Sequence, residues 1–173
     1  LHGRSANADI ILCNRHGGSY VSNYLKDNLH SLLESTDSSD IPAVIKVQRA
    51  HGGYLRRYRG GPLERFREPE AEDEHGRRGM SLEEMCVLSF LQADNNVLAD
   101  PTSGKSGSVG TVLLMHSLDS QHSLPYYSSS LISLTIAHLG DTRALLASTL
   151  SGTATALTAN HHPDSRVESE RLR

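Results

Sequence analysis

The spacing of apolar residues along the chain predicts helices in its first half and strands in its second half. Apolar residues recur at helical spacing over residues 19–33 and 81–95, and a further helix is predicted from Ala43 onward. A short apolar run predicts a first strand at residues 9–13. Four more strands are predicted in succession, at residues 108–115, 131–138, 143–148 and 153–157. This order favours helices packed on antiparallel β-sheets, an α+β fold, over alternating β-α-β units.

Residues 131–146, LISLTIAHLGDTRALL, are the segment around which the rest of the chain is organised. Apolar residues occupy both alternating sets of positions in its first half, so we expect this strand to be covered on both faces. Gly140-Asp141 then gives a turn signal before the next apolar run. A single carboxylate between two strands is either a turn residue or a ligand, and the residues alone favour the turn.

The helix over residues 81–95 carries a recognisable start signal. Ser81 followed by Glu84 forms a capping box, in which each side chain satisfies a backbone N–H of the first turn. The stripe expected to be buried consists of Leu82, Met85, Leu88 and Leu91, with Phe90 at its margin. We interpret this stripe as core packing.

Composition and charge exclude several classes of function. A chain of 173 residues is long enough for one domain with a core. The net charge of −3 gives no reason to expect nucleic acid or an anionic membrane as a partner, and no apolar run is long enough for a membrane span. Cys13 and Cys86 match neither a metal site nor a disulfide framework, which indicates a reducing, intracellular compartment.

Two further features concern the organisation of the chain. Residues 60–79 are dense in Glu, Asp and Arg and contain two prolines, so a mobile, charged insertion is predicted there. The chain begins with Leu1 instead of Met, no signal peptide is visible, and a helix is predicted to start at Glu168 close to the last residue. We therefore interpret the chain as a fragment.

Residues 99–106, ADPTSGKS, match a loosened phosphate-binding loop pattern with Ala in place of the first Gly. Such a loop binds phosphate when a strand leads into it and a helix follows it. Here the predicted order is a helix followed by a strand. Nucleotide binding through this loop remains a rival hypothesis that the inverted order disfavours.

Four segments occur along the chain in a specific order. They are CNRHGG at residues 13–18, SGSVGTV at 106–112, IAHLGDTRALL at 136–146 and LTANHHP at 157–163, followed by Glu168 and Arg171. Together they resemble the metal-dependent protein phosphatases (the PPM family, type 2C serine/threonine phosphatases), which carry FDGHGG, SGSTA, VANVGDSRAVL and LTxDHKP leading to ExxRI. Residues 51–59 and 82–94 are similar to a fungal mitochondrial branch of that family.

The resemblance implies a four-layer sandwich of antiparallel β-sheets flanked by helices. Residues 1–173 would form a single, incomplete domain of this kind, because the later DG and DN motifs of the family are absent. The implied activity is hydrolysis of phosphoserine and phosphothreonine in phosphoproteins, and the implied location is mitochondrial. Incomplete sheets leave unpaired strand edges, so we also expect self-association through those edges.

The resemblance also assigns roles to particular residues. His16 matches the family's general acid, a role that suits an imidazole near neutral pH. Asp141 matches the Asp of GDS, which in the family lies near an accessory third metal ion. His161 and His162 could form a metal pair by composition, but adjacent residues of an extended segment point to opposite faces, which favours hairpin-exit residues without a shared metal.

Asn14 and Arg15 depart from the family pattern. They occupy the Asp-Gly position, where the family's carboxylate bridges two Mg²⁺ or Mn²⁺ ions and the Gly carbonyl binds one of them. Asn14 has one neutral carbonyl oxygen, and Arg15 keeps its backbone carbonyl but brings a fixed positive charge. An impaired metal centre is therefore expected. The alternative is a catalytically inactive pseudophosphatase that binds a partner.

Overall fold

The structure is a computed structural model that describes residues 8–44, 80–118 and 128–171. The chain forms two compact units, one made of Leu1–Gly17 and Gly107–Arg173 and the other of Gly18–Ser106. The predicted charged insertion at residues 60–79 lies outside the described residues, as does the predicted helix from Ala43 beyond residue 44.

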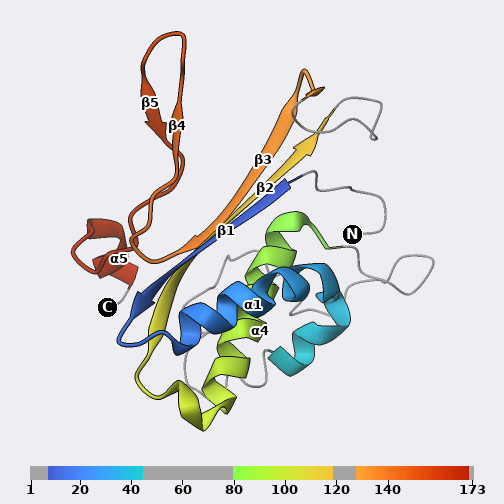
Figure 1. Ribbon diagram of the computed structural model, residues 1–173, viewed down its shortest axis with the longest axis vertical. Helices are drawn as coiled ribbons and strands as arrows, with labels where there is room; N and C mark the ends of the chain where they lie inside the picture. Colours follow the sequence, from blue (N-terminus) through green and yellow to red (C-terminus); the bar gives the residue numbers. More distant parts are fainter. Residues whose placement is uncertain (1–7, 45–79, 119–127, 172–173) are drawn as a thin grey trace. The chain divides into compact units, whose positions relative to one another are not determined.

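The first unit contains two antiparallel sheets, and the second contains a pair of packed helices (Figure 1). The strands of the larger sheet, in spatial order, are β1 (Ala8–His16), β2 (Gly107–Ser117) and β3 (Ile132–Leu139). The smaller sheet pairs β4 (Leu145–Ala147) with β5 (Ala154–Ala156), and the short helix α5 (Arg166–Arg171) follows. This combination of helices and antiparallel sheets confirms the predicted α+β class.

β1 is longer than the sequence predicted. Its expected end was Cys13, but the strand continues to His16 because Cys13–His16 pair with the first residues of β2. Pairing over this distance in the sequence outweighs the polar character of residues 14–16, which is locally typical of a turn. In contrast, β4 and β5 are shorter than predicted.

The strands of the larger sheet give it two chemically different faces, because alternate side chains of a strand point to opposite sides. Paired residues lie on the same face, so the register defines each set. The Ile10 face consists of Ile10, Leu12, Asn14, His16, Gly107, Val109, Thr111, Leu113, Met115, Ser117, Ile132, Leu134, Ile136 and His138. The Ile11 face consists of Ile11, Cys13, Arg15, Ser108, Gly110, Val112, Leu114, His116, Ser133, Thr135, Ala137 and Leu139.

The expectation that residues 131–138 would be covered on both faces is wrong. β3 is an edge strand, and Ile132 and Leu134 on its Ile10 face are 42% and 39% exposed. The buried apolar side chains of the sheet are Val112 and Leu114 on the Ile11 face of the central strand β2. A run of apolar residues on both sides of a strand thus marked a strand correctly, but it did not mark burial.

In the second unit, α1 (Tyr20–Ser35) packs against α4 (Leu82–Ala99). The buried side of α1 consists of Val21, Ser22, Leu25, Leu29 and Leu33, at the predicted helical spacing. The capping box of α4 is confirmed: Glu84 N–H donates to Ser81 Oγ at 3.2 Å, and Ser81 N–H donates to Glu84 Oε2 at 2.7 Å. The helix extends to Ala99, past the predicted end at residue 95.

The predicted buried stripe of α4 is only partly correct. Leu88 is fully buried and packs with Ile41 and Val44, but the other members of the predicted stripe, and Phe90, are half-buried. A second buried face of α4 consists of the small residues Cys86, Ser89 and Ala93 together with Val97. The periodicity of large apolar residues missed this face, because small side chains suit close helix contacts but carry little hydrophobic signal.

Polar contacts fix the small-residue face of α4 to the end of α1. Thr36 Oγ1 lies 2.8 Å from Ser89 Oγ, 2.8 Å from Gln92 Oε1 and 2.6 Å from the carbonyl oxygen of Leu32. Beside them, burial raises the pKa of the Cys86 thiol to about 11, and Glu83 adds to the shift. Cys86 is therefore an unreactive packing residue near neutral pH.

Tyr20, in the first turn of α1, and Asp100, at the end of α4, tie the two helices together at one end. The Tyr20 hydroxyl donates to Asp100 Oδ2, and Thr102 donates to Asp100 Oδ1 from its N–H at 2.8 Å and its hydroxyl at 2.7 Å. These bonds, led by that from Tyr20, lower the pKa of Asp100, and the bond to Asp100 raises the pKa of Tyr20.

We expect Tyr20→Phe to destabilise the chain at pH 6, where Asp100 is ionised and accepts the lost hydrogen bond. A carboxyl whose pKa is lowered by folding stabilises the native state above its unfolded pKa of about 3.9, and this stabilisation is lost as pH falls through the lower folded value. The difference between wild type and Tyr20→Phe should therefore shrink below about pH 4. Urea unfolding of wild type and Tyr20→Phe, at pH 6 and below about pH 4, measures this difference in the free energy of unfolding.

Tyr24→Phe is the matched control, because the Tyr24 hydroxyl accepts from Asn96 Nδ2 at 2.9 Å and no carboxylate shares that bond. The change in unfolding free energy caused by Tyr24→Phe should not depend on pH over the same range. An unchanged effect of Tyr20→Phe at low pH would contradict this account of Asp100.

Candidate functional site

The three site residues predicted from the first motif lie at the end of β1, in a strand instead of a turn. Asn14 pairs with Val109, Arg15 with Ser108 and His16 with Gly107. Asn14 and His16 belong to the Ile10 face and Arg15 to the Ile11 face, and all three are exposed. The positive charge of Arg15 was expected beside the site, but strand alternation directs its side chain to the opposite face of the sheet.

Two hydrogen bonds hold Asn14, one to its neighbour in the chain and one to β2. Its side-chain oxygen Oδ1 accepts from the backbone N–H of Arg15 at 2.9 Å. Its backbone carbonyl accepts from the hydroxyl of Ser108 at 2.7 Å. The amide therefore presents a neutral oxygen that already serves a local contact, where a bridging metal ligand would need an anionic one.

Asp141 follows β3 in a turn that closes against β2. Gly140 adopts φ 99°, and a Cβ there would lie 2.8 Å from Cβ of Val109 and closer still to its Cγ1. Thr142 Oγ1 lies 2.6 Å from Thr111 Oγ1, which joins the residue after Asp141 to the same strand. Because Val109 is also the partner of Asn14, the sheet brings the Asn14 and Asp141 segments to the same end of β2.

His138 and His161 form a ring pair beside this turn. Their centroids are 4.2 Å apart with an interplanar angle of 39°. His138 Nε2 lies 2.6 Å from the carbonyl oxygen of Ala159, and the backbone N–H of His161 donates to Gly140 at 3.2 Å. These contacts hold residues 159–161 against the end of β3.

Sequence reasoning missed the contact between His138 and His161, because it joins residues far apart in the chain. His138 stands where the family motif VANVGDSRAVL has Asn, but this difference does not identify His161 as its partner.

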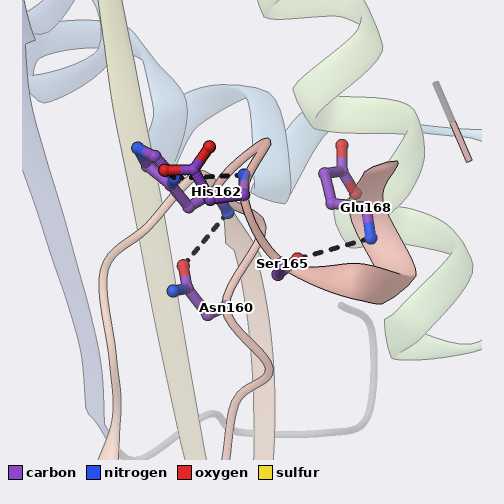
Figure 2. Close-up of polar contacts among 5 residues, drawn as sticks. Asn160, His162, Ser165 and Glu168 are labelled. Atoms are coloured by element: carbon purple, nitrogen blue, oxygen red, sulfur yellow. Dashed lines mark hydrogen bonds and ion pairs between the residues drawn. The ribbon is translucent and has the colours of Figure 1, made fainter. Parts of the chain in front are cut away.

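Figure 2 shows the contacts of His162, which differ from those of His161 given above. Its backbone N–H donates to Asn160 Oδ1 at 3.0 Å, and its Nδ1 lies 3.2 Å from Asp164 Oδ2. The two adjacent histidines therefore make different contacts, as expected of neighbours that point to opposite faces. In the same view, Ser165 Oγ accepts from the backbone N–H of Glu168 at 3.3 Å and caps α5.

The arrangement does not fit the pair of hard cations that the resemblance implies. Mg²⁺ and Mn²⁺ bind best to several anionic oxygens. In the part of the chain that the structure describes, no three His, Cys, Asp or Glu side chains gather into a group that could hold a metal ion. Asp141 is exposed and supplies one carboxylate, and Asn14 supplies none.

The loop at residues 99–106 does not form a phosphate cradle. α4 precedes it and β2 follows it, with the short 3₁₀ turn η3 (Pro101–Ser103) between them. The N–H groups of Thr102 and Ser103 donate to Asp100, and that of Ser106 donates to Ser103. These donors are engaged within the loop, around a carboxylate that would repel a phosphate.

Within the described ranges, none of the helices has the length and apolar character needed to cross a bilayer.

Comparisons with known proteins agree with the order of the motifs. A family model for protein phosphatase 2C matches residues 2–173. A relative from Schizosaccharomyces pombe (strain 972 / ATCC 24843), named protein phosphatase 2C homolog 4, is 34% identical over 163 residues. The match covers 91% of this chain and 40% of the relative, so the chain spans less than half of that protein's length. No solved structure matches the chain. The resemblance predicted from the motifs is thus confirmed, and the chain belongs to the protein phosphatase 2C family.

Proposed function

We propose that this chain derives from a metal-dependent protein serine/threonine phosphatase and that its metal centre is impaired. Family membership supports phosphoprotein hydrolysis as the ancestral activity. The observation that carries the impairment is Asn14, whose neutral amide stands where the family uses a bridging carboxylate. Its oxygen is already bonded to the N–H of Arg15.

The surviving groups would keep parts of the ancestral chemistry. His16 is exposed at the end of β1, where it would protonate the leaving serine or threonine oxygen. Asp141 would contribute one carboxylate toward Mg²⁺ or Mn²⁺. With Asn14 in the bridging position, we propose that metal affinity falls too low for turnover at ordinary metal concentrations.

The second candidate function is a catalytically inactive module that binds a partner. The observation that favours it is the amount of apolar surface left open. Leu145 and Leu146 of β4 are 61% and 58% exposed. Among the described residues, β1 and β3 are the edge strands of their sheet, and such edges can support self-association. An intracellular, mitochondrial location is also proposed, on the resemblance of residues 51–59 and 82–94, and a fluorescent fusion of the full gene product would test it.

A chimera with the fission yeast relative tests the proposed function directly. The residues of that relative that match this chain would be replaced by residues 1–173. We expect the unmodified chimera to hydrolyse a phosphothreonine peptide with Mn²⁺ at least about 100-fold more slowly than a chimera carrying Asn14→Asp and Arg15→Gly.

The unmodified relative is the positive control. If both chimeras hydrolyse the peptide as fast as the relative, the proposal of an impaired metal centre is wrong. If neither chimera turns over the peptide while the relative does, residues 14 and 15 are not the reason, and the partner-binding candidate is favoured.

A further inference from the structure

A pair of threonine hydroxyls anchors the turn that carries Asp141. Thr142 Oγ1, one residue past Asp141, lies 2.6 Å from Thr111 Oγ1 on the central strand β2. Both threonine side chains are partly buried, whereas Asp141 is exposed. A partly buried hydroxyl that loses its partner keeps the cost of its lost hydration, so the bonded arrangement is favoured over separation of the two side chains.

The residue before Asp141 is fixed as well. Gly140 has φ 99°, and a Cβ at this position would overlap the side chain of Val109 on β2. The carbonyl of Gly140 accepts from the backbone N–H of His161 at 3.2 Å. Asp141 therefore lies between two residues that are each held by the surrounding chain, and the residue after it is held through its side chain.

We propose that Thr111 and Thr142 are positioning residues for Asp141, because their hydrogen bond sets the direction in which this exposed carboxylate leaves the turn. β2 carries Thr111 and Val109 on the same face of the sheet, and Val109 pairs with Asn14. The bond thus fixes the Asp141 turn to the strand that also places Asn14. The consequence for activity rests on the proposed function, in which Asp141 is a surviving group.

Replacements at Thr142 separate the hydroxyl from the shape of the side chain. Thr142→Val keeps the shape and removes the hydroxyl, whereas Thr142→Ser keeps the hydroxyl and removes a methyl group. Thr153→Val is the matched control, because Thr153 Oγ1 lies 2.7 Å from Ser151 Oγ in the turn between β4 and β5. It removes a hydroxyl bond of the same kind from the same unit, away from Asp141.

The first measurement is amide hydrogen exchange in the 173-residue chain without metal. Two amides report opening of the turn. Ala144 N–H donates to Thr158 Oγ1 at 3.0 Å, and His161 N–H donates to the carbonyl of Gly140. Local opening breaks these bonds and lets both amides exchange with solvent.

We expect Thr142→Val and Thr111→Val each to speed exchange of the two amides about two- to tenfold, the range for loss of one hydrogen bond between neutral groups. Thr142→Ser should exchange like the wild type, and Thr153→Val should leave both amides unchanged. Because the two hydroxyls bond to each other, the double variant Thr111→Val, Thr142→Val should exchange no faster than either single variant.

The second measurement uses the chimera with the fission yeast relative that carries Asn14→Asp and Arg15→Gly. In this chimera we expect Thr142→Val to raise the Mn²⁺ concentration for half-maximal rate about two- to tenfold, and Thr142→Ser to keep the original value. KM for the phosphothreonine peptide at saturating Mn²⁺ should stay unchanged, because the hydroxyl acts through the carboxylate of Asp141. A general loosening of the fold would change both constants.

Three outcomes would overturn the proposal. Unchanged exchange of Ala144 and His161 in both valine variants means that the hydroxyl pair does not hold the turn. Equally fast exchange in Thr142→Ser and Thr142→Val means that the shape of the side chain, not its hydroxyl, is responsible. An altered KM for the peptide with an unchanged Mn²⁺ dependence means that the hydroxyl does not act through Asp141.

Failure of the proposed function looks different. It would appear as an unmodified chimera that is as fast as the relative, or as no turnover in either chimera. The exchange of the two amides in the 173-residue chain decides the positioning in both cases.

Discussion

The 173-residue chain is expected to hydrolyse an aryl phosphate in the presence of Mn²⁺ no faster than in a metal-free blank. Weakening even the groups that orient metal ligands lowers affinity or activity about 10- to 100-fold, and replacing a bridging carboxylate by an amide removes a ligand charge outright. Asn14 has only a neutral oxygen to offer, and it accepts from Arg15 N–H. Release of nitrophenol followed with and without Mn²⁺ measures the effect.

The double variant Asn14→Asp, Arg15→Gly should also be inactive in this chain. It restores one carboxylate in addition to that of Asp141, but two carboxylates are still fewer than a two-ion centre of hard cations needs. The control for the added carboxylate alone is Asn28→Asp, which places a carboxylate on the exposed side of α1. Clear Mn²⁺-dependent turnover by the double variant would show that the restored carboxylate and Asp141 suffice.

Replacing Gly140 by Ala should destabilise the sheet by about 2–4 kcal/mol, combining a positive φ with a methyl group forced into a packed neighbour. The clash falls on Val109, with 2.8 Å between the added Cβ and the Cβ of Val109. Chemical denaturation of the variant measures the loss.

The double variant Gly140→Ala, Val109→Ala relieves part of the clash. Val109→Ala removes the closest atom, Cγ1, and should recover part of the loss, while the 2.8 Å approach to the Cβ of residue 109 and the cost of the positive φ remain. Gly152→Ala is the control for backbone conformation alone, because it has φ 68° and open space around the added Cβ. If Gly140→Ala costs no more than Gly152→Ala, the packing against Val109 is not a constraint.

Features that depend on neighbours in the chain could be predicted from the sequence. The capping box of Ser81 and Glu84 joins residues three apart, and the buried side of α1 repeats with the period of the helix itself. The turn at Gly140 and the different contacts of His161 and His162 likewise followed from local rules. The order of the motifs gave the family.

Features that depend on distant pairing could not be predicted in this way. Asn14, Arg15 and His16 look like the start of a loop, and only their pairing with residues 107–109 makes them a strand. The contact between His138 and His161 requires the chain to return after β5. The prediction that residues 131–138 would be buried on both faces was wrong for a related reason. Alternation shows which residues share a face of a sheet, but it does not show which face is covered.

The pairing of β1 with β2 makes the strand more sensitive to changes in length than to changes in side chains. A deletion of one residue between Leu12 and Asn14 would shift all later positions by one place in the register. His16 would then exchange faces with Arg15, and the imidazole would move to the opposite side of the sheet. We therefore expect substitutions in β1 to disturb the site less than insertions or deletions, even though residues 14–16 are exposed.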